Sequence, residues 1–386
     1  MSRRVLVLGL TAFALGVPTG SVPIDSSDAS VAAVQHQIAR VLDQRERAVL
    51  TGDADAWLGT LDDPANSAQR AQFEALDGLE LQEWSERLIA LEHGPNGSWR
   101  AGVQVRYRFP GDETDAIVSA VMDLTSRFLV AGWSAAGMSP WEIDGVRPHA
   151  GRHSLVLGAG SRQVLGTYAA ELDQASASVG ALLGESPPQL VLVLPDDWNL
   201  AGRMVPSGVG PGLAAVTSEL GPPDTKAGPL RIVADPAVLA GLDPASRTAL
   251  FGHEAFHVAQ HGAGAAPLWL AEGLADYAGY RESGIAVKRA VAGLLRHARK
   301  YGVPTALPPD AAFGDPQQAS WAYEGAHLAV RLLVEEHGVA DVIALHDATA
   351  DRGVAATEAA LRDVLGTDIA AVTAAWRAEV AGLASR

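Results

Sequence analysis

The sequence HEAFH, at residues 253–257, places two imidazoles and a carboxylate within little more than one helical turn. Positions four apart on an α-helix lie about 40° from each other on one face, so His253 and His257 can point at a single metal ion. Glu254 lies about 100° round the helix from His253, beside such an ion rather than on it. From there it can reach a metal-bound water, which is the arrangement of a hydrolytic zinc site.

A hydrolytic zinc ion takes three protein ligands and keeps a fourth position for water, so the motif requires one more ligand on a nearby element. The stretch PLWLAEGLADY, at residues 267–277, supplies Glu272 on a second amphipathic helix. Between the two helices, Gly262 and Gly264 can end the first helix and Pro267 can begin the second. The sequence therefore predicts a reversal of the chain that brings Glu272 to the two histidines.

The two stretches together, HEAFHVAQH and PLWLAEGLADYAGY, resemble the paired motifs of the gluzincins, which are the thermolysin-type and aminopeptidase-N-type metallopeptidases. Within them, the chain is similar to bacterial peptidases whose second motif reads W-L-x-E-G-x-A-x-Y. The resemblance covers roughly residues 230–335. It implies that His253, His257 and Glu272 bind Zn²⁺, that Glu254 is the general base, and that the domain is mostly helical and zincin-like with a small sheet.

Asp276 follows Glu272 by four residues and therefore shares its helix face. In thermolysin-like enzymes an aspartate in this place orients the first histidine ligand. The resemblance thus implies that Asp276 accepts a hydrogen bond from the second ring nitrogen of His253 and fixes its tautomer. The alternative is that Asp276 is an ordinary solvated residue of the helix.

The reaction also needs a donor to the oxyanion, and in the aminopeptidase branch a tyrosine downstream of the glutamate ligand provides it. Tyr323 has this place in the order of the chain, and His327, one turn later, is the second candidate. Tyr323 can equally be a half-buried aromatic that packs against the site. The aminopeptidase element Gly-x-Met-Glu-Asn is missing, which favours endopeptidase action and leaves aminopeptidase action open.

The first residues have the features of an export signal. Met1-Ser2-Arg3-Arg4 is a basic start, and a largely apolar run extends from Val5 to Val17. This run is shorter than the about 20 apolar residues that a membrane-spanning helix needs. We therefore expect residues 1–21 to be a signal peptide or weak anchor, and the protein to be secreted or associated with the cell envelope.

The composition limits the partners and ligands. The chain has no cysteine, which excludes disulfides and thiolate ligands and leaves histidines and carboxylates to bind a metal. The net charge of −16 argues against nucleic acid, which requires a basic face. We expect a peptide or protein substrate and no stable membrane insertion beyond the N-terminal signal, while the oligomeric state stays open.

The pattern of elements predicts an α+β fold with two domains, at residues 30–150 and 151–386. In the first domain, helices precede strands, an order similar to the nuclear-transport-factor-like cone fold. Its predicted helices span residues 31–50 and 67–76 with a short helix after Asp53, and its predicted strands span residues 103–109, 115–124 and 126–133. Alternation of apolar and polar residues from Val103 to Phe109 indicates one buried face.

A further strand is expected around residues 153–158, in continuation of this run of strands, and in the second domain we expect strands at residues 190–194 and 230–234. The last of these has the place of the edge strand that lines the substrate cleft in gluzincin-like domains. The segment 196–228, rich in glycine and proline, is expected to be a loop near the cleft. Helices are predicted at residues 161–183, 319–336, 354–365 and 369–382.

These features favour an extracytoplasmic zinc metallopeptidase. The alternative is a catalytically silent extracytoplasmic binding protein with a structural or vestigial zinc site. Glu254 argues against it, because a structural zinc site fills its fourth position and needs no adjacent base. Hydrolysis of an amide other than a peptide is a third possibility.

Overall fold

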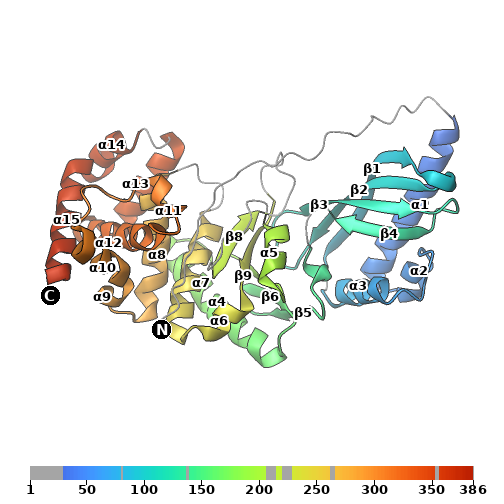
Figure 1. Cartoon of the computed structure of the whole chain (residues 1–386), viewed down its shortest axis with the longest axis horizontal. Coiled ribbons are helices and arrows are strands. Elements are labelled where there is room, and N and C mark those ends of the chain that lie inside the picture. Colours follow the sequence, from blue (N-terminus) through green and yellow to red (C-terminus); the bar gives the residue numbers. More distant parts are fainter. Residues whose placement is uncertain are drawn as a thin grey trace.

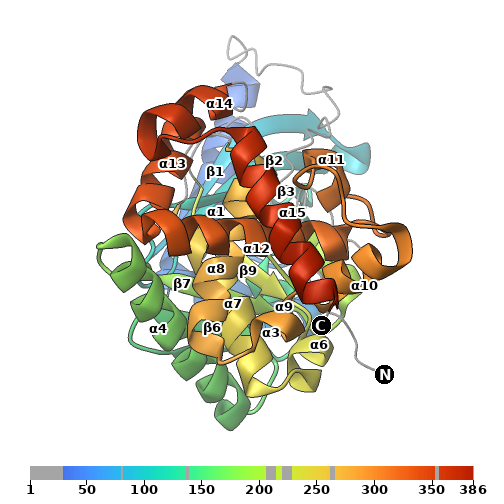
Figure 2. The same ribbon diagram turned by 90° about the vertical axis from the view of Figure 1, so that its left-hand side faces the viewer.

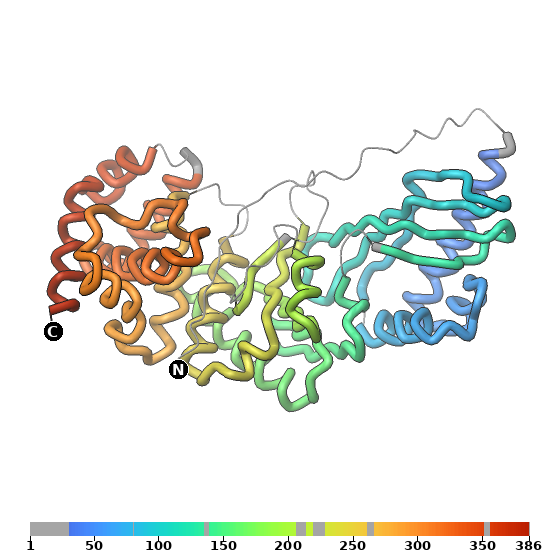
Figure 3. Tube along the Cα trace, viewed as in Figure 1, coloured from blue at the N-terminus to red at the C-terminus, as the bar shows by residue number. Residues whose placement is uncertain are grey.

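The protein consists of two β-sheets followed by a group of helices, arranged one after another along its long axis (Figure 1). The Cα trace shows that this order in space follows the order of the chain (Figure 3). The computed structural model describes residues 29–79, 81–135, 139–205, 214–219, 228–260, 266–352 and 356–385. The predicted export signal at residues 1–21 lies outside them, as does most of the predicted reversal between residues 260 and 267.

The first sheet is antiparallel throughout, with strand order β1-β2-β3-β4, and helices pack on one of its faces. The predicted alternation is confirmed, since Val103, Val105 and Tyr107 are buried and Gln104 and Arg106 are not. The elements of this unit are α1 (Ala29–Thr51), α2 (Ala54–Leu58), α3 (Ser67–Gly78), β1 (Glu83–His93), η1 (Pro95–Gly97), β2 (Trp99–Arg108), β3 (Ala116–Leu124), β4 (Val130–Ala135) and η2 (Pro140–Glu142).

Strand β1 was not predicted, because a charged residue occupies one of its core-facing positions. Glu86 is buried and lies next to Arg45 of α1, with 2.9 Å between Oε2 and Nε. The guanidinium of Arg45 also lies over the ring of Trp57, 3.5 Å from its centroid. This nonlocal ion pair compensates the burial of a carboxylate that, in the sequence, interrupts the apolar pattern of a strand.

The second sheet has strand order β5-β6-β7-β9-β8. Strands β6, β7 and β9 are parallel, and the two edge strands, β5 and β8, are antiparallel to their neighbours. Because β5 pairs with β6, this sheet begins a few residues before the predicted boundary at 150/151. Its elements are β5 (Arg147–Ala150), β6 (Ser154–Gly158), α4 (Arg162–Leu183), β7 (Leu190–Leu194), α5 (Trp198–Met204), β8 (Ala215–Glu219), β9 (Leu230–Ala234), α6 (Pro236–Gly241) and α7 (Pro244–Ala259).

Both faces of the second sheet are covered, which explains why strands such as LVLVL at residues 190–194 are apolar at every position. Alternate residues belong to two different cores. One set packs with the first sheet and its helices: Leu155, Leu157, Val191, Val193, Val216 and Val233. The other set packs with α4, α7 and the helices beyond: Val156, Leu190, Leu192, Leu194, Ala215, Ile232 and Ala234.

Two expectations about this sheet are wrong. The segment 196–228 is not only a loop, since it contains α5 and β8. The strand at residues 230–234 is not an edge strand, because β8 pairs antiparallel with it on the side away from β7. In β8, the polar residues Thr217, Ser218 and Glu219 follow Val216, so it lacks the apolar run that marks the equally long strand β7.

The rest of the chain is helical. The helix predicted at residues 319–336 and the final helix are confirmed, and Asp368 accepts a hydrogen bond of 2.8 Å from the backbone N–H of Ala371. Among the described residues, no helix combines the length and apolar character needed to span a membrane. The remaining elements are α8 (Leu268–Ser283), α9 (Val287–Ala290), α10 (Ala292–Tyr301), α11 (Asp310–Phe313), α12 (Ala319–His337), α13 (Val339–Arg352), α14 (Thr357–Ala360), η4 (Leu361–Leu365), a π-helical turn, and α15 (Ile369–Ser385).

Helices and strands in two small sheets agree, at a coarse level, with the predicted α+β class. A buried ion pair joins the two sheets. Arg231 of β9 donates to both carboxylate oxygens of Asp112, in the turn after β2, at 2.7 and 2.6 Å. The side chains of Arg231 and Asp112 are only 1% and 4% exposed, and Arg231 also lies against the ring of Phe109. The pair fixes the first sheet on the second.

We therefore expect Asp112→Ala to destabilise the protein strongly, because it leaves the guanidinium of Arg231 buried without its partner. A loss of about 3–5 kcal/mol in the free energy of unfolding is expected for such a change. Urea unfolding followed by tryptophan fluorescence measures it. The control is Asp123→Ala, which removes an ion pair with Arg100 in which both side chains are more than half exposed, and which should cost less than about 1 kcal/mol. Equal costs for the two variants would contradict this role of the buried pair.

Candidate metal centre

Helix α7 carries the two histidines of the HEAFH motif. It begins after Asp243, whose side chain accepts a hydrogen bond of 2.8 Å from the backbone N–H of Ser246, and Pro244 occupies its first turn. One side of the helix packs into the core shared with α4 and the second sheet. His253 lies in the buried part of α7, with its side chain 1% exposed, and His257 lies one turn later at 14%.

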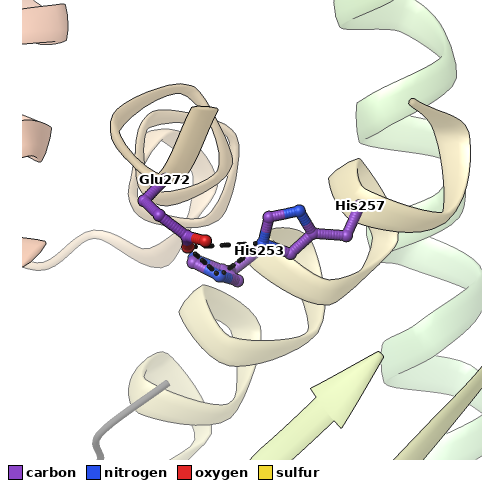
Figure 4. Close-up of side chains that lie close together, drawn as sticks. All are labelled: His253, His257 and Glu272. Atoms are coloured by element: carbon purple, nitrogen blue, oxygen red, sulfur yellow. Dashed lines mark hydrogen bonds and ion pairs between the residues drawn. The ribbon is translucent and has the colours of Figure 1, made fainter. Parts of the chain in front are cut away.

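Helix α8 carries Glu272 and Asp276 and lies between α7 and α12, as the view in Figure 2 shows. It follows Pro267 and ends at Ser283, where Gly284 adopts a positive φ of 69°. The side chain of Glu272 is 2% exposed and faces α7 (Figure 4). A buried glutamate requires compensating partners, and α7 supplies them.

Glycines let α7 and α8 approach each other closely. A Cβ atom at Gly279 would lie 2.1 Å from the carbonyl oxygen of Ala249, and one at Gly252 would lie 2.7 Å from the Cα of Gly279. On the other side of α8, a Cβ at Gly273 would lie 2.6 Å from the carbonyl oxygen of Ala326 in α12. No side chain fits between the backbones at these points, so the three helices hold Glu272 within reach of the histidines.

The structure brings His253, His257 and Glu272 together (Figure 4). The Nε2 atoms of the two histidines are 3.0 Å apart. Oε2 of Glu272 lies 3.3 Å from Nε2 of His253 and 3.4 Å from Nε2 of His257. Ligands at about 2.0–2.2 Å from a tetrahedral zinc ion lie about 3.3–3.6 Å from one another. The three donor atoms therefore have nearly the separations of three corners of a zinc tetrahedron.

Asp276 of α8 contacts the second ring nitrogen of His253. Its Oδ1 is 2.9 Å from Nδ1 of His253, and its side chain is 14% exposed, so it is not a freely solvated residue. When Nδ1 donates its hydrogen to this carboxylate, Nε2 of His253 keeps its lone pair and points toward Glu272 and His257. The contact thus selects the tautomer that can bind a metal ion.

The electrostatics of the cluster favour positive charge. Burial works to lower the pKa of His253, but the carboxylates of Asp276 and Glu272 outweigh it and raise this pKa to about 10. Burial also works to raise the pKa of Glu272, and the imidazoles of His257 and His253 outweigh it and lower this pKa to about 2. The cluster therefore favours a bound proton, and a metal ion that binds these groups must displace it.

Glu254 is buried beside this cluster, with 1% of its surface exposed. Its Oε2 accepts a hydrogen bond of 2.6 Å from the hydroxyl of Thr217 on β8. Its Oε1 has no hydrogen-bond partner among the residues that the structure describes. The sequence gives no signal for Thr217, because β8 carries no motif and lies in a segment predicted to be a loop.

The two candidates for the oxyanion donor pack against different aromatic rings. The ring of Tyr323 in α12 is 6.4 Å from that of His253, centroid to centroid, and Tyr323 is 7% exposed. His327 instead packs on Tyr280, two helical turns beyond Glu272, with ring centroids 4.7 Å apart. Burial lowers the pKa of His327 to about 4, so it is neutral at ordinary pH. Tyr323 is the candidate with a ring contact to His253, and it also packs against Phe313.

Comparison with known proteins adds no further assignment. No family model matches the chain, and neither a curated protein nor a solved structure is significantly similar to it. The functional interpretation therefore depends on the residues and geometry of the site itself.

The close approach of α7 and α8 leads to a test. Gly279→Ala places a methyl group against the backbone of α7, so the helices must separate, at a cost of about 1–3 kcal/mol and with loss of metal affinity. Metal content after dialysis against zinc, measured by inductively coupled plasma mass spectrometry, and urea unfolding check both effects. Gly382→Ala in α15 is the control, because no atom of another described element lies within 4 Å of its Cβ position. A Gly279→Ala variant with normal zinc content and stability would refute this role of the glycine contact.

Proposed function

We propose that the protein is an extracytoplasmic zinc-dependent peptidase of the gluzincin type. His253, His257 and Glu272 would hold the zinc ion, and Glu254 would act as the general base. The proposal includes a zincin-like fold for the helical part with the second sheet, and a cone-shaped, nuclear-transport-factor-like fold for the N-terminal part. The observation that carries it is the set of three donor atoms separated by 3.0–3.4 Å, with a buried glutamate next to them.

The choice of zinc in this proposal follows from the general chemistry of the donor set. Two imidazoles and one carboxylate are the ligands of catalytic zinc in one of its commonest forms, which keeps a position open for water. A calcium or magnesium ion would instead prefer a shell of oxygen atoms. The contact with Asp276 leaves a lone pair on Nε2 of His253, and the imidazoles keep the carboxylate of Glu272 ionised. One nitrogen donor and one oxygen donor of this kind suit Zn²⁺, which is intermediate between hard and soft cations.

Each residue of the proposed site would have a separate role in peptide-bond hydrolysis. When bound, zinc supplies Lewis-acid polarisation of the scissile carbonyl and lowers the pKa of water towards about 7. Glu254 takes a proton from the attacking water and can pass it to the leaving amine. Asp276 keeps the ring of His253 in place. The hydroxyl of Tyr323 would donate a hydrogen bond to the oxyanion, because it lies on the helix that faces the histidines.

Substitutions at Glu254 and His257 test this function. We expect Glu254→Gln to bind zinc normally and to lose peptide hydrolysis, because an amide cannot accept the proton. His257→Ala should lose both zinc and activity, because it removes a ligand. Cleavage of a mixture of peptides by the purified full chain, with and without a chelator, and the zinc content of each variant are the measurements.

The control for this experiment is His36→Ala, which removes an exposed histidine of α1. It should change neither zinc content nor hydrolysis. If the wild-type protein binds zinc but cleaves no peptide, and Glu254→Gln leaves its other properties unchanged, the proposal fails in favour of a silent binding protein with a structural zinc site. Cleavage that persists at full rate after zinc is removed would also contradict it.

A second test concerns Tyr323. We expect Tyr323→Phe to lower kcat by roughly ten- to several hundredfold, since it removes one donor to the oxyanion, and to leave zinc content unchanged. Steady-state kinetics on a cleavable peptide and metal analysis measure the two quantities. Full activity in Tyr323→Phe would remove Tyr323 from the mechanism, and a loss in His327→Gln alongside it would transfer the role to His327.

A further inference from the structure

The hydrogen bond between Thr217 and Glu254 joins the edge strand of the second sheet to the helix that carries the histidines. Side chains alternate along β8, so that Val216 packs toward the first sheet while Ala215 packs in the core that includes α7. Thr217 is buried at 4% exposure. Its hydroxyl points at Glu254 because the position shares the α7-facing side of the strand with Ala215.

The hydrogen bond is short and sheltered from solvent. Its 2.6 Å between the two oxygen atoms is in the range of charge-assisted bonds from a hydroxyl to a carboxylate. Both residues are almost fully buried, so water does not compete for the contact. Threonine is branched at Cβ and has few rotamers, so the hydroxyl is a rigid donor on a strand that is itself paired to β9. The bond therefore fixes one oxygen of the carboxylate.

The second oxygen of this carboxylate is in the opposite situation. Within the described part of the chain, Oε1 of Glu254 has no hydrogen-bond partner, although it is buried. A buried carboxylate oxygen left without a partner costs free energy, and proteins keep such atoms mainly where a ligand, water or substrate completes them. The contact with Thr217 thus occupies one oxygen and leaves the other for the reaction.

We propose that Thr217 is the positioning residue of the general base: its hydroxyl holds Oε2 of Glu254 so that Oε1 faces the attacking water. This inference rests on the proposed peptidase function and adds a residue to it. Thr217 does not touch the substrate or the metal in this role. It acts only through the orientation of Glu254, which a misplacement of about 1 Å would impair by up to a hundredfold.

Thr217→Val and Thr217→Ser test the role. Valine keeps the size and branching and removes the donor, so we expect kcat to fall roughly ten- to a hundredfold with KM and zinc content within about twofold of the wild type. Serine keeps the hydroxyl and should restore kcat to within about fivefold of the wild type, although its side chain is less restricted. The control is Thr248→Val, the same substitution on α7 at a hydroxyl that bonds the carbonyl oxygen of Pro244. It should leave kcat unchanged.

A structural readout separates this inference from the function on which it rests. Crystal structures of the zinc-loaded wild type and Thr217→Val show the orientation of the Glu254 carboxylate directly, whether or not a substrate is known. We expect it to rotate or to adopt several conformers in Thr217→Val and to stay fixed in Thr217→Ser. An unchanged carboxylate in Thr217→Val, or equal losses of kcat in the valine and serine variants, would overturn the inference. A wild-type protein that cleaves no peptide would instead overturn the proposed function.

Discussion

The contact between the backbones of α7 and α8 at Gly252 and Gly279 is the constraint on which the site depends. A glutamate side chain is short, so Glu272 reaches two histidines on another helix only if the helix axes come unusually close. Glycines remove the Cβ atoms that would otherwise set a larger separation. The motif supplies the chemical groups, and this contact determines whether they meet.

The second sheet connects this site to the rest of the molecule. On the face of the sheet that packs against α7, Thr217 of β8 contacts Glu254. On the opposite face, Arg231 of the neighbouring strand β9 contacts Asp112 of the first sheet's unit. Because both faces are packed, the sheet cannot shift relative to α7 without disturbing a core on its other side. The N-terminal unit therefore helps to hold the second sheet, and with it Thr217 and Glu254, in a fixed position. It supplies none of the proposed zinc ligands.

The sequence predicted the features that depend on local patterns. Such patterns within a few neighbouring residues are the alternation along β2, the apolar run of β7 and the spacing of His253 and His257 on α7. The structure contains the strands β2 and β7 and the helix α7. The sequence did not predict β1 or β8, because Glu86 is compensated by Arg45 far away in the chain and β8 gains its pairing from β9. The contact of Thr217 with Glu254 could not be predicted for the same reason, because no pattern in neighbouring residues indicates that β8 packs against α7.

The groups around His253, His257 and Glu272 bear on whether the proposed zinc ion would be structural or catalytic. A structural zinc ion takes a fourth protein ligand. Two further carboxylates of α7 and α8 have other partners: Asp276 accepts from Nδ1 of His253, and Oε2 of Glu254 accepts from the hydroxyl of Thr217. Neither is arranged as a fourth ligand, while Oε1 of Glu254 stays available to a water molecule. This division of roles among Glu272, Asp276 and Glu254 supports the proposed catalytic function over a purely structural ion.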